Sequence, residues 1–314
     1  MTALEPLVRL AEAAALATPV ARKRMLIIVN PMATTITDRT RNLVVGALHG
    51  RYEVEAIDTE ARGHATELCL DAAKEGYDVI VSFGGDGTVN EVANGLIGCA
   101  TPVTCLPGGA TNVLCKMLGI PGDIVDATQH LLAMADRWSP RQIDLGTANG
   151  RAFTYTSGFG VDASVVKRIE QSPRAKQHRL REYFFVYAAV ETVLRHYVRH
   201  PPRMELHLDG RSERVITTIV QNAEQMTYLD DKPIAIAEGA GLQTGSLAGV
   251  ALRLLSAKRS VVGHRQIVDF RDVDGLRCVS VDGRAIPLHA DGDHLGDVTE
   301  AVFGVLPGAL AVVS

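Results

Sequence analysis

Residues 79–97 read VIVSFGGDGTVNEVANGLI and establish the plan of the first half of the chain. The segment begins with an apolar run of strand length, 79–83. After a glycine-rich loop, Val89, Val92 and Leu96 follow at helical spacing. The pattern predicts a strand that ends in the loop Gly84-Gly85-Asp86-Gly87-Thr88, with a helix directly behind that loop.

Three further β-loop-α units surround this one. Apolar runs of strand length lie at 25–29, 52–57 and 103–106, and helical stretches follow them up to about residue 48, over 63–76 and over 111–118. Strands that alternate with helices predict a doubly wound parallel sheet, with helices on both faces. One more helical stretch, 123–137, completes this half.

From Ile143 onward the chain has a different character. Apolar residues alternate in the strand manner, as over 204–208, 214–220 and 298–302, and Asp-Gly or glycine-rich turns separate these runs. One long helix is expected over 181–199. A chain of 314 residues is long enough for two domains at roughly 150 residues each, so we expect an α/β domain followed by a mainly β domain.

Composition excludes several classes of protein. The net charge of −4 gives no bulk attraction for nucleic acid, and any membrane contact must be local. The five cysteines contain no CxxC pair, which argues against a disulfide framework or a zinc site. The basic cluster Arg22-Lys23-Arg24 follows the first apolar stretch, the wrong order for a secretory signal. We expect a cytoplasmic protein without a spanning segment, and oligomeric state stays open.

The loop Gly84 to Thr88 has two interpretations. Glycines at the start of a helix let the backbone and its free N–H groups approach a phosphate, and Asp86 beside that phosphate implies a divalent cation. Alternatively, Asp-Gly is an ordinary turn. A second glycine-rich loop, Pro107-Gly108-Gly109-Ala110-Thr111-Asn112, favours the first interpretation, because both loops follow strands that end at the same crevice.

Together these motifs resemble the diacylglycerol kinase catalytic family. The resemblance rests on GGDGTVNE (84–91), Asn30-Pro31, Thr59 followed by Gly63, and PGGATN (107–112), and it runs from about residue 25 to the end. GGDGT alone also occurs in NAD kinases. Neither loop has the GxxxxGK[ST] pattern or a full GxGxxG, which argues against a P-loop NTPase and against a dinucleotide-binding fold. Within the family the chain is most similar to the actinobacterial branch.

The resemblance implies an N-terminal NAD-kinase/diacylglycerol-kinase-like sheet, a C-terminal mainly β sandwich domain, and ATP with Mg²⁺ in the cleft between them. The implied divisions are an extension (1–24), a nucleotide-binding domain (25–142), a substrate domain (143–300) and a segment returning to the first domain (301–314). Asp86 would hold the Mg²⁺. The residues implied to contact ATP are Asn30, Pro31, Met32, Ala33, Thr34, Thr59, Gly84, Gly85, Asp86, Gly87, Thr88, Val89, Asn90, Glu91, Gly109, Ala110, Thr111 and Asn112.

A second group of polar residues lies near the end of the chain, in His289-Ala290-Asp291-Gly292-Asp293-His294. In an extended strand His289, Asp291 and Asp293 would share one face, a spacing that a metal could use. The alternative is an Asp-Gly hairpin turn. By resemblance, Asp293 matches the general base that accepts the proton of the lipid hydroxyl, with Asp where many relatives have Glu.

Three positions depart from the family pattern. Ala110 stands where relatives carry Thr or Ser, and Thr244 stands where an Asp joins a structural Mg²⁺ site, which predicts that this second site is lost or weakened. The segment 222–232 lacks the usual glycines. These departures keep a third hypothesis open beside the lipid kinase and an NAD-kinase-like enzyme: a catalytically weak relative that binds nucleotide or lipid.

Basic and aromatic residues around 167–187 also allow two interpretations. They form either a surface that touches the inner face of the membrane or a domain core with an ordinary charged face. The residues are Lys167, Arg168, Arg174, Lys176, Arg179, Arg181, Tyr183, Phe184, Phe185 and Tyr187.

The function predicted from the whole chain is transfer of the γ-phosphoryl group of ATP to diacylglycerol or a related lipid alcohol, a step of phospholipid biosynthesis.

Overall fold

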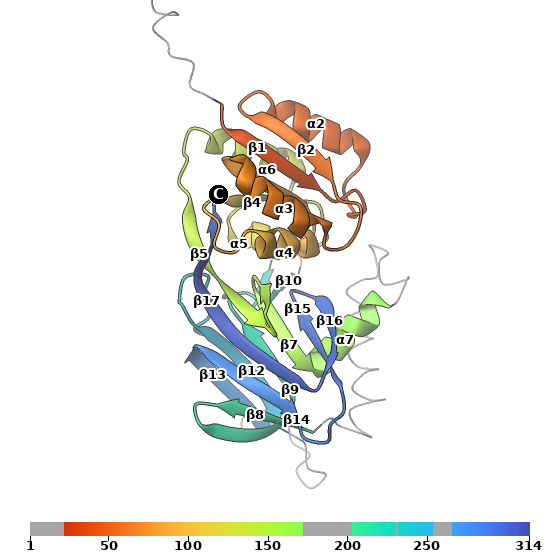
Figure 1. Cartoon of the computed structure of the whole chain (residues 1–314), viewed down its shortest axis with the longest axis vertical. Helices are drawn as coiled ribbons and strands as arrows, with labels where there is room; N and C mark the ends of the chain where they lie inside the picture. The colour runs from red at the N-terminus through yellow and green to blue at the C-terminus, as the bar shows by residue number, and fades with distance from the viewer. Residues whose placement is uncertain (1–21, 172–202, 230–231, 254–265) are drawn as a thin grey trace, which may run out of the picture.

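The computed structural model describes residues 22–171, 203–229, 232–253 and 266–314. In the first half a parallel sheet runs in the order β2-β1-β3-β4 (Figure 1). These strands span Arg24–Val29 (β1), Glu53–Asp58 (β2), Val79–Gly84 (β3) and Val103–Pro107 (β4). The central strands β1 and β3 are almost entirely buried, as their continuous apolar sequences predict.

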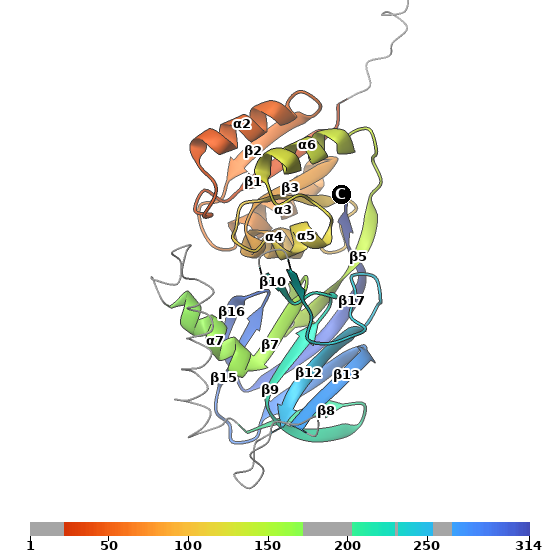
Figure 2. The same cartoon turned by 180° about the vertical axis from the view of Figure 1, so that it is seen from behind.

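Helices cover both faces of this sheet. They are α2 (Asp38–Leu48), α3 (His64–Glu75), α4 (Asp86–Gly95), α5 (Val113–Met117) and α6 (Ile124–Met134). The chain moves from β1 outward to β2 and then back past β1 to β3, so right-handed crossovers place α2 and α3 on opposite faces. Accordingly α2 contacts α6 and α3 contacts α4, and α2 and α6 face the viewer in Figure 2.

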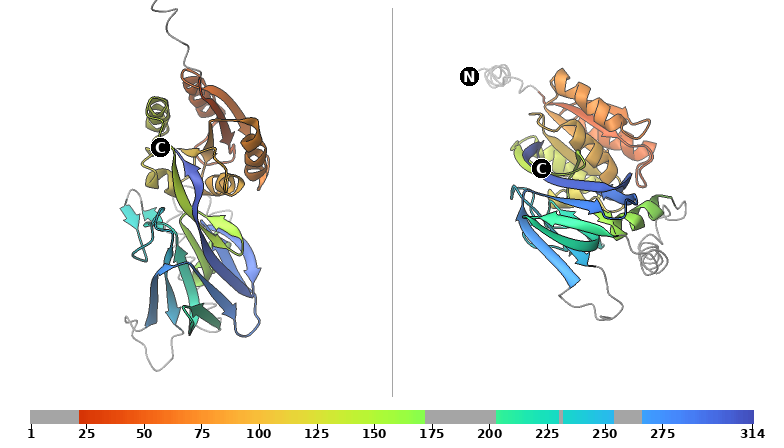
Figure 3. Two further views of the ribbon diagram at one scale, coloured as in Figure 1. Left: turned by 60° about the vertical axis from the view of Figure 1, so that its left-hand side comes forward. Right: turned by 60° about the horizontal axis from the view of Figure 1, so that its bottom comes forward.

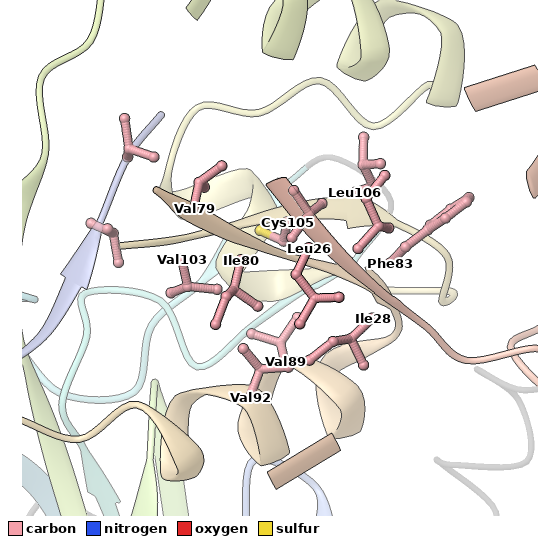
Figure 4. Packing of buried hydrophobic residues seen from close by; sticks show 14 of the residues in the cluster. Leu26, Ile28, Val79, Ile80, Phe83, Val89, Val92, Val103, Cys105 and Leu106 are labelled. Atoms are coloured by element: carbon pink, nitrogen blue, oxygen red, sulfur yellow. The ribbon is translucent and has the colours of Figure 1, made fainter. Parts of the chain in front are cut away.

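The first hydrophobic core lies between the sheet and these helices. Figure 4 shows Val89 and Val92 of α4 pointing toward Leu26, Ile28 and Ile80 of the sheet. All five side chains are at most 3% exposed. The helical spacing of Val89 and Val92 therefore directs one face of α4 into the core and leaves its amino end at the edge of the sheet.

The second half is rich in β-structure, and a continuous sheet runs through it in the order β16-β15-β7-β9-β8-β14-β17. A second core, which includes Phe153, Phe159 and Phe303, lies here. The elements are β5 (Arg141–Ala148), β6 (Arg151–Phe153), β7 (Thr156–Gly160), α7 (Val161–Glu170), β8 (Met204–Leu208), β9 (Arg211–Gln221), β10 (Thr227–Leu229), β11 (Lys232–Ile234), β12 (Leu247–Arg253), β13 (Ile267–Val273), β14 (Gly275–Ser280), β15 (Ile286–Ala290), β16 (Asp293–Val298) and β17 (Glu300–Val312).

Two long strands join the halves. Strands β5 and β17 pair antiparallel and run side by side between the two lobes (Figure 3). At its end β17 reaches the first sheet, where Val312 pairs in parallel with Val103 of β4. The last residues of the chain are thus part of the sheet whose other strands come from the first half.

The predicted α/β class, a parallel sheet followed by a β-rich half, is confirmed. Some details differ. Helix α5 is shorter than the stretch 111–118, and the strand expected over 298–302 is divided between the end of β16 and the start of β17. Helix α7 was not expected, and the helix predicted over 181–199 lies outside the described residues. In the described part of the chain, no helix is long and apolar enough to cross a bilayer.

Candidate active site

Three loops meet at the carboxyl ends of β1, β3 and β4. The Asn30 backbone N–H donates to Phe83 O (2.9 Å), and its side chain donates to Thr88 Oγ1 (3.1 Å) while accepting from Met32 N (3.0 Å). Pro31 and Met32 beside it are exposed. Thr59, which follows β2, joins the same edge because its N–H donates to Val29 O (2.8 Å).

The two glycine-rich loops touch backbone to backbone. A Cβ atom at Gly109 would lie 2.7 Å from Gly85 Cα, and one at Gly108 would lie 3.0 Å from Gly84 Cα. Asn112, in the left-handed region at φ 50°, closes the second loop by bonding both the N–H and the carbonyl of Gly109 (2.9 Å each). Glycine is required here because any side chain would push the loops apart.

Asp86 lies at the first residue of α4, where helix N–H groups have no intrahelical acceptor. Its Oδ1 accepts from Val113 N at the start of α5 (2.6 Å), which ties the two loops together. Among the described residues, no group of three His, Cys, Asp or Glu side chains is arranged for a metal. A divalent ion at Asp86 therefore fits only if water and phosphate oxygens supply its other ligands, which is the usual manner of Mg²⁺.

A cavity of about 200 Å³ opens beside these loops. Residues of three loops and of α2, β3, β4 and α6 line it: Thr35, Thr40, Phe83, Pro107, Gly109, Asn112, Gly122, Asp123 and Ile124. Of the predicted ATP contacts, Gly109 and Asn112 belong to this lining. Ala33 and Thr34 come directly before Thr35 in the chain, and Ala110 and Thr111 lie between Gly109 and Asn112.

The residues after the loop point in different directions. Thr88 contacts Asn30, and Val89 lies in the core. Glu91 accepts from Gly63 N (2.8 Å) and Ala65 N (3.2 Å), so its carboxylate caps the amino end of α3. Asn90 is 2% exposed and contacts the second half of the chain. The GGDGTVNE segment thus serves both the loop and the packing around it.

Asp293 approaches this loop from the second half. Asp291 and Gly292 have φ values of 48° and 80°, which make a two-residue hairpin turn between β15 and β16. The Oδ2 atom of Asp293 lies 3.2 Å from where a Cβ of Gly87 would be and 3.6 Å from Arg62 Nη2. The carboxylate proposed as base therefore faces the first turn of α4.

The turn also decides between the two interpretations of residues 289–294. The hairpin reading is correct, and a shared metal face of His289, Asp291 and Asp293 is wrong, because the turn directs the three side chains apart. His289 is buried and contacts Asp162 Oδ2 through Nε2 (2.9 Å). Asp291 is 4% exposed and is surrounded by N–H groups of residues 154–156.

Burial raises the pKa of Asp293 to about 6. Arg62 opposes this increase, whereas the nearby carboxylates of Glu170, Asp291 and Glu91 add to it. A carboxylate with a pKa near 6 is still ionised at neutral pH and binds a proton more readily than an ordinary Asp, which suits a general base.

Asp293 also lines a cavity of about 460 Å³ between the two halves. The polar lining includes Arg62, Arg151 and His294, and the apolar lining consists of Ala148, Leu288, Leu295 and Val298. The sequence motifs did not indicate Arg62, Arg151 or Glu170. Arg62 carried one local signal, its place directly before Gly63, whereas the other two come near Asp293 only through the tertiary fold.

The loop around Thr244 is closed by its own hydrogen bonds. The Thr244 hydroxyl lies 3.0 Å from Gly241 O and 3.1 Å from Ser246 O. Asp144 accepts from Gly245 N and Gly308 N, both at 2.7 Å. The loss or weakening of a second metal site stays a prediction, and these contacts are consistent with it, because the loop is held without a second carboxylate.

Only the start of the basic-aromatic segment is described. Lys167 lies in α7 and binds Asp297 Oδ2 (2.5 Å), and Arg168 follows it in the same helix. The remaining eight residues lie outside the described residues. Lys167 therefore holds α7 to β16, and a membrane surface at this segment stays a prediction.

The fold and site together define an α/β protein in which the first glycine-rich loop faces a carboxylate from a β-rich half. Residues 24–170 match the model of the Diacylglycerol kinase catalytic domain. Similar proteins include the Diacylglycerol kinase of Bacillus subtilis (strain 168), 38% identical over 112 residues, which cover 35% of this chain and 36% of that protein. A Diacylglycerol kinase of Staphylococcus aureus (strain bovine RF122 / ET3-1) is 34% identical over 145 residues, 44% of each chain.

A crystal structure of a diacylglycerol kinase from Bacillus anthracis (strain Sterne) has the same fold, with a TM-score of 0.66 over 93% of this chain and 96% of that one, at 20% identity. The matches to the curated relatives span about half of their length or less. Residues 24–170 are therefore similar to the diacylglycerol kinase catalytic family. The place of the chain in the actinobacterial branch stays a prediction.

Proposed function

We propose that this protein is an ATP-dependent lipid kinase that transfers the γ-phosphoryl group to the hydroxyl of diacylglycerol or a related lipid alcohol. The observation that carries the proposal is the approach of Asp293 to the first turn of α4. A carboxylate with a raised pKa there lies beside the loop that suits a phosphate.

The donor side of the proposed site consists of the three loops. Residues 30–34, 84–88 and 109–112 would bind ATP, with backbone N–H groups directed at its phosphates. Asp86 would hold Mg²⁺, which when bound neutralises charge on the phosphate oxygens. Asn30 and Thr35 hold the first loop against the other two through Thr88 Oγ1 and Gly108 O (3.1 and 2.9 Å).

The acceptor side is the cavity of about 460 Å³. Its volume falls in the range of small-molecule sites, and its apolar residues suit the carbon atoms next to a lipid hydroxyl. Asp293 would accept the proton of that hydroxyl as the hydroxyl oxygen attacks the γ-phosphorus of ATP. The bond from this phosphorus to the bridging oxygen then breaks, and ADP leaves with the electron pair. Because phosphoryl transfer depends mainly on positioning and charge neutralisation, these few groups suffice.

The test is incubation of the full chain with labelled ATP, Mg²⁺ and mixed lipid micelles. Wild type should label a phosphatidate-type product, and Asp86→Ala and Asp293→Asn should not. Asp209→Asn is the matched control, because Asp209-Gly210 is another left-handed Asp-Gly turn (φ 50° and 73°) and lies at the β8–β9 connection. Its activity should equal that of wild type.

Two outcomes would refute the proposal in favour of its alternatives. Label in NAD but in no lipid would indicate an NAD-kinase-like enzyme with a soluble acceptor. Binding of ATP and Mg²⁺ without transfer to any lipid would indicate a catalytically weak relative, as Ala110 and Thr244 suggest.

A further inference from the structure

A buried carboxylate next to the proposed base is held by five hydrogen bonds. Asp291 Oδ2 accepts from Asn90 Nδ2 (2.9 Å) and from the N–H and hydroxyl of Thr154 (2.6 and 2.9 Å). Its Oδ1 accepts from Tyr155 N (3.0 Å) and Thr156 N (3.2 Å). With its acceptors satisfied and 4% of its surface exposed, Asp291 is unsuited to contact substrate itself.

The contact with Asn90 joins the two halves of the chain. Asn90 Oδ1 accepts from Arg151 Nε (3.2 Å) and Nη2 (2.8 Å), while its Nδ2 donates to Asp291. The amide therefore lies between a guanidinium and a carboxylate, which fixes its orientation, since only its nitrogen can donate. Such charge-assisted hydrogen bonds are stronger than neutral ones.

Each residue of this contact is close in sequence to a residue proposed to act in phosphoryl transfer. Asn90 is four residues after Asp86, one helical turn behind the amino end of α4. Asp291 is separated from Asp293 by Gly292 alone, within a tight hairpin turn. A shift of the Asn90–Asp291 contact would consequently move Asp293 relative to the loop at Gly87.

We propose that Asn90 and Asp291 are positioning residues that hold the Asp293 carboxylate at the amino end of α4. The inference rests on the proposed phosphoryl transfer, and it gives Asn90 a role other than the predicted contact with ATP. A misplacement of about 1 Å in such a site can lower the rate about 10²-fold.

Asn94 provides a matched control on the same helix. Its side chain also crosses between the halves, where it bonds Ala152 O and Ala152 N (3.0 Å each). It donates to Asn90 Oδ1 as well (3.2 Å), but it does not contact Asp291, and without it Asn90 Oδ1 keeps both bonds from Arg151. Asn90 bonds the same carbonyl, Ala152 O (2.9 Å). Replacing either residue by Ala thus removes hydrogen bonds between the halves, and only Asn90→Ala removes the contact to the hairpin.

The experiment compares the full-length wild type, Asn90→Ala and Asn94→Ala by steady-state kinetics and by hydrogen–deuterium exchange of residues 286–298. We expect Asn90→Ala to lower kcat about 10²-fold with little change in KM for ATP. Its hairpin should exchange faster. Asn94→Ala should keep kcat within about threefold of wild type and exchange its hairpin as wild type does.

If Asn90→Ala does not fold, Asp291→Asn replaces it, because Asn tolerates the left-handed conformation and keeps the shape of the side chain. This variant should also lower kcat and speed exchange of the hairpin. Equal losses in Asn90→Ala and Asn94→Ala, or a change in KM for ATP alone, would overturn the proposal. A wild type that phosphorylates no lipid would refute the proposed function, and unchanged exchange of the hairpin in Asn90→Ala would then refute the positioning role by itself.

Discussion

Replacing Asp293 by Asn should stabilise the protein at neutral pH while it removes activity. The pKa of Asp293 is raised from 3.8 to about 6, so the folded protein prefers this group protonated. Its ionised form is therefore a cost to folding at neutral pH. Asn has the same shape and no charge, so the variant does not bear that cost, whereas loss of a general base should lower kcat by about 10²–10⁴-fold.

The sign of the pH dependence follows from proton binding. Between the unfolded and the folded pKa, the folded state binds the proton of Asp293 and the unfolded state has released it, so stability falls as pH rises. The shift of about two pKa units corresponds to roughly 3 kcal/mol at most. Because 33% of the side chain is exposed to water, we expect a smaller effect, about 1–2 kcal/mol.

The assay is urea unfolding of wild type and Asp293→Asn at about pH 4.5 and about pH 7.5. The variant should be more stable than wild type by about 1–2 kcal/mol at the higher pH, and most of this difference should vanish at the lower pH. Other titrating groups cancel in the comparison. A difference that is independent of pH, or a variant less stable than wild type at about pH 7.5, would refute the assigned environment of Asp293.

Three glycine substitutions test the packing around the site. Gly109→Ala should weaken ATP binding at least about tenfold in calorimetry, because its Cβ would lie 2.7 Å from Gly85 Cα and separate the loops. Gly158→Ala should destabilise the fold by about 1–3 kcal/mol in thermal unfolding, since its Cβ would overlap Asp162 Oδ2 at 1.6 Å. Gly46→Ala should stabilise α2 by about 0.5–1 kcal/mol, because no atom lies within 4 Å of the place of its Cβ. This variant is the control for the other two, and a loss of ATP binding in it would contradict the explanation given for Gly109→Ala.

The sequence indicated the first half of the fold well, for a physical reason. Strands β1, β3 and β4 are buried on both faces and read as apolar runs, with glycine or proline close to their ends, whereas the edge strand β2 alternates. Parallel strands that end at one edge necessarily bring their following loops together. The meeting of the GGDGT and PGGATN loops could therefore be predicted from local patterns alone.

The arrangement around Asp293 could not be predicted in this way. His289, Asp291 and Asp293 would share a face only in a continuous strand, and the two-residue turn at Asp291-Gly292 separates them. Asn90 and Asp291 are 201 residues apart in sequence, so no local pattern joins them. Helix α7 was missed because its helical pattern is short, within Val161–Glu170, and follows two glycines that read as a loop.

The segment Thr88 to Glu91 shows why a motif is not one unit of function. Successive residues of an α-helix are rotated by about 100°, so four consecutive side chains face four directions. Here they meet Asn30, the core, the second half of the chain and the amino end of α3. Only the loop before this segment is proposed to contact phosphate through its backbone. The remaining residues of GGDGTVNE pack the start of α4 against Asn30, the core and α3. Asn90 also contacts the hairpin that carries Asp293.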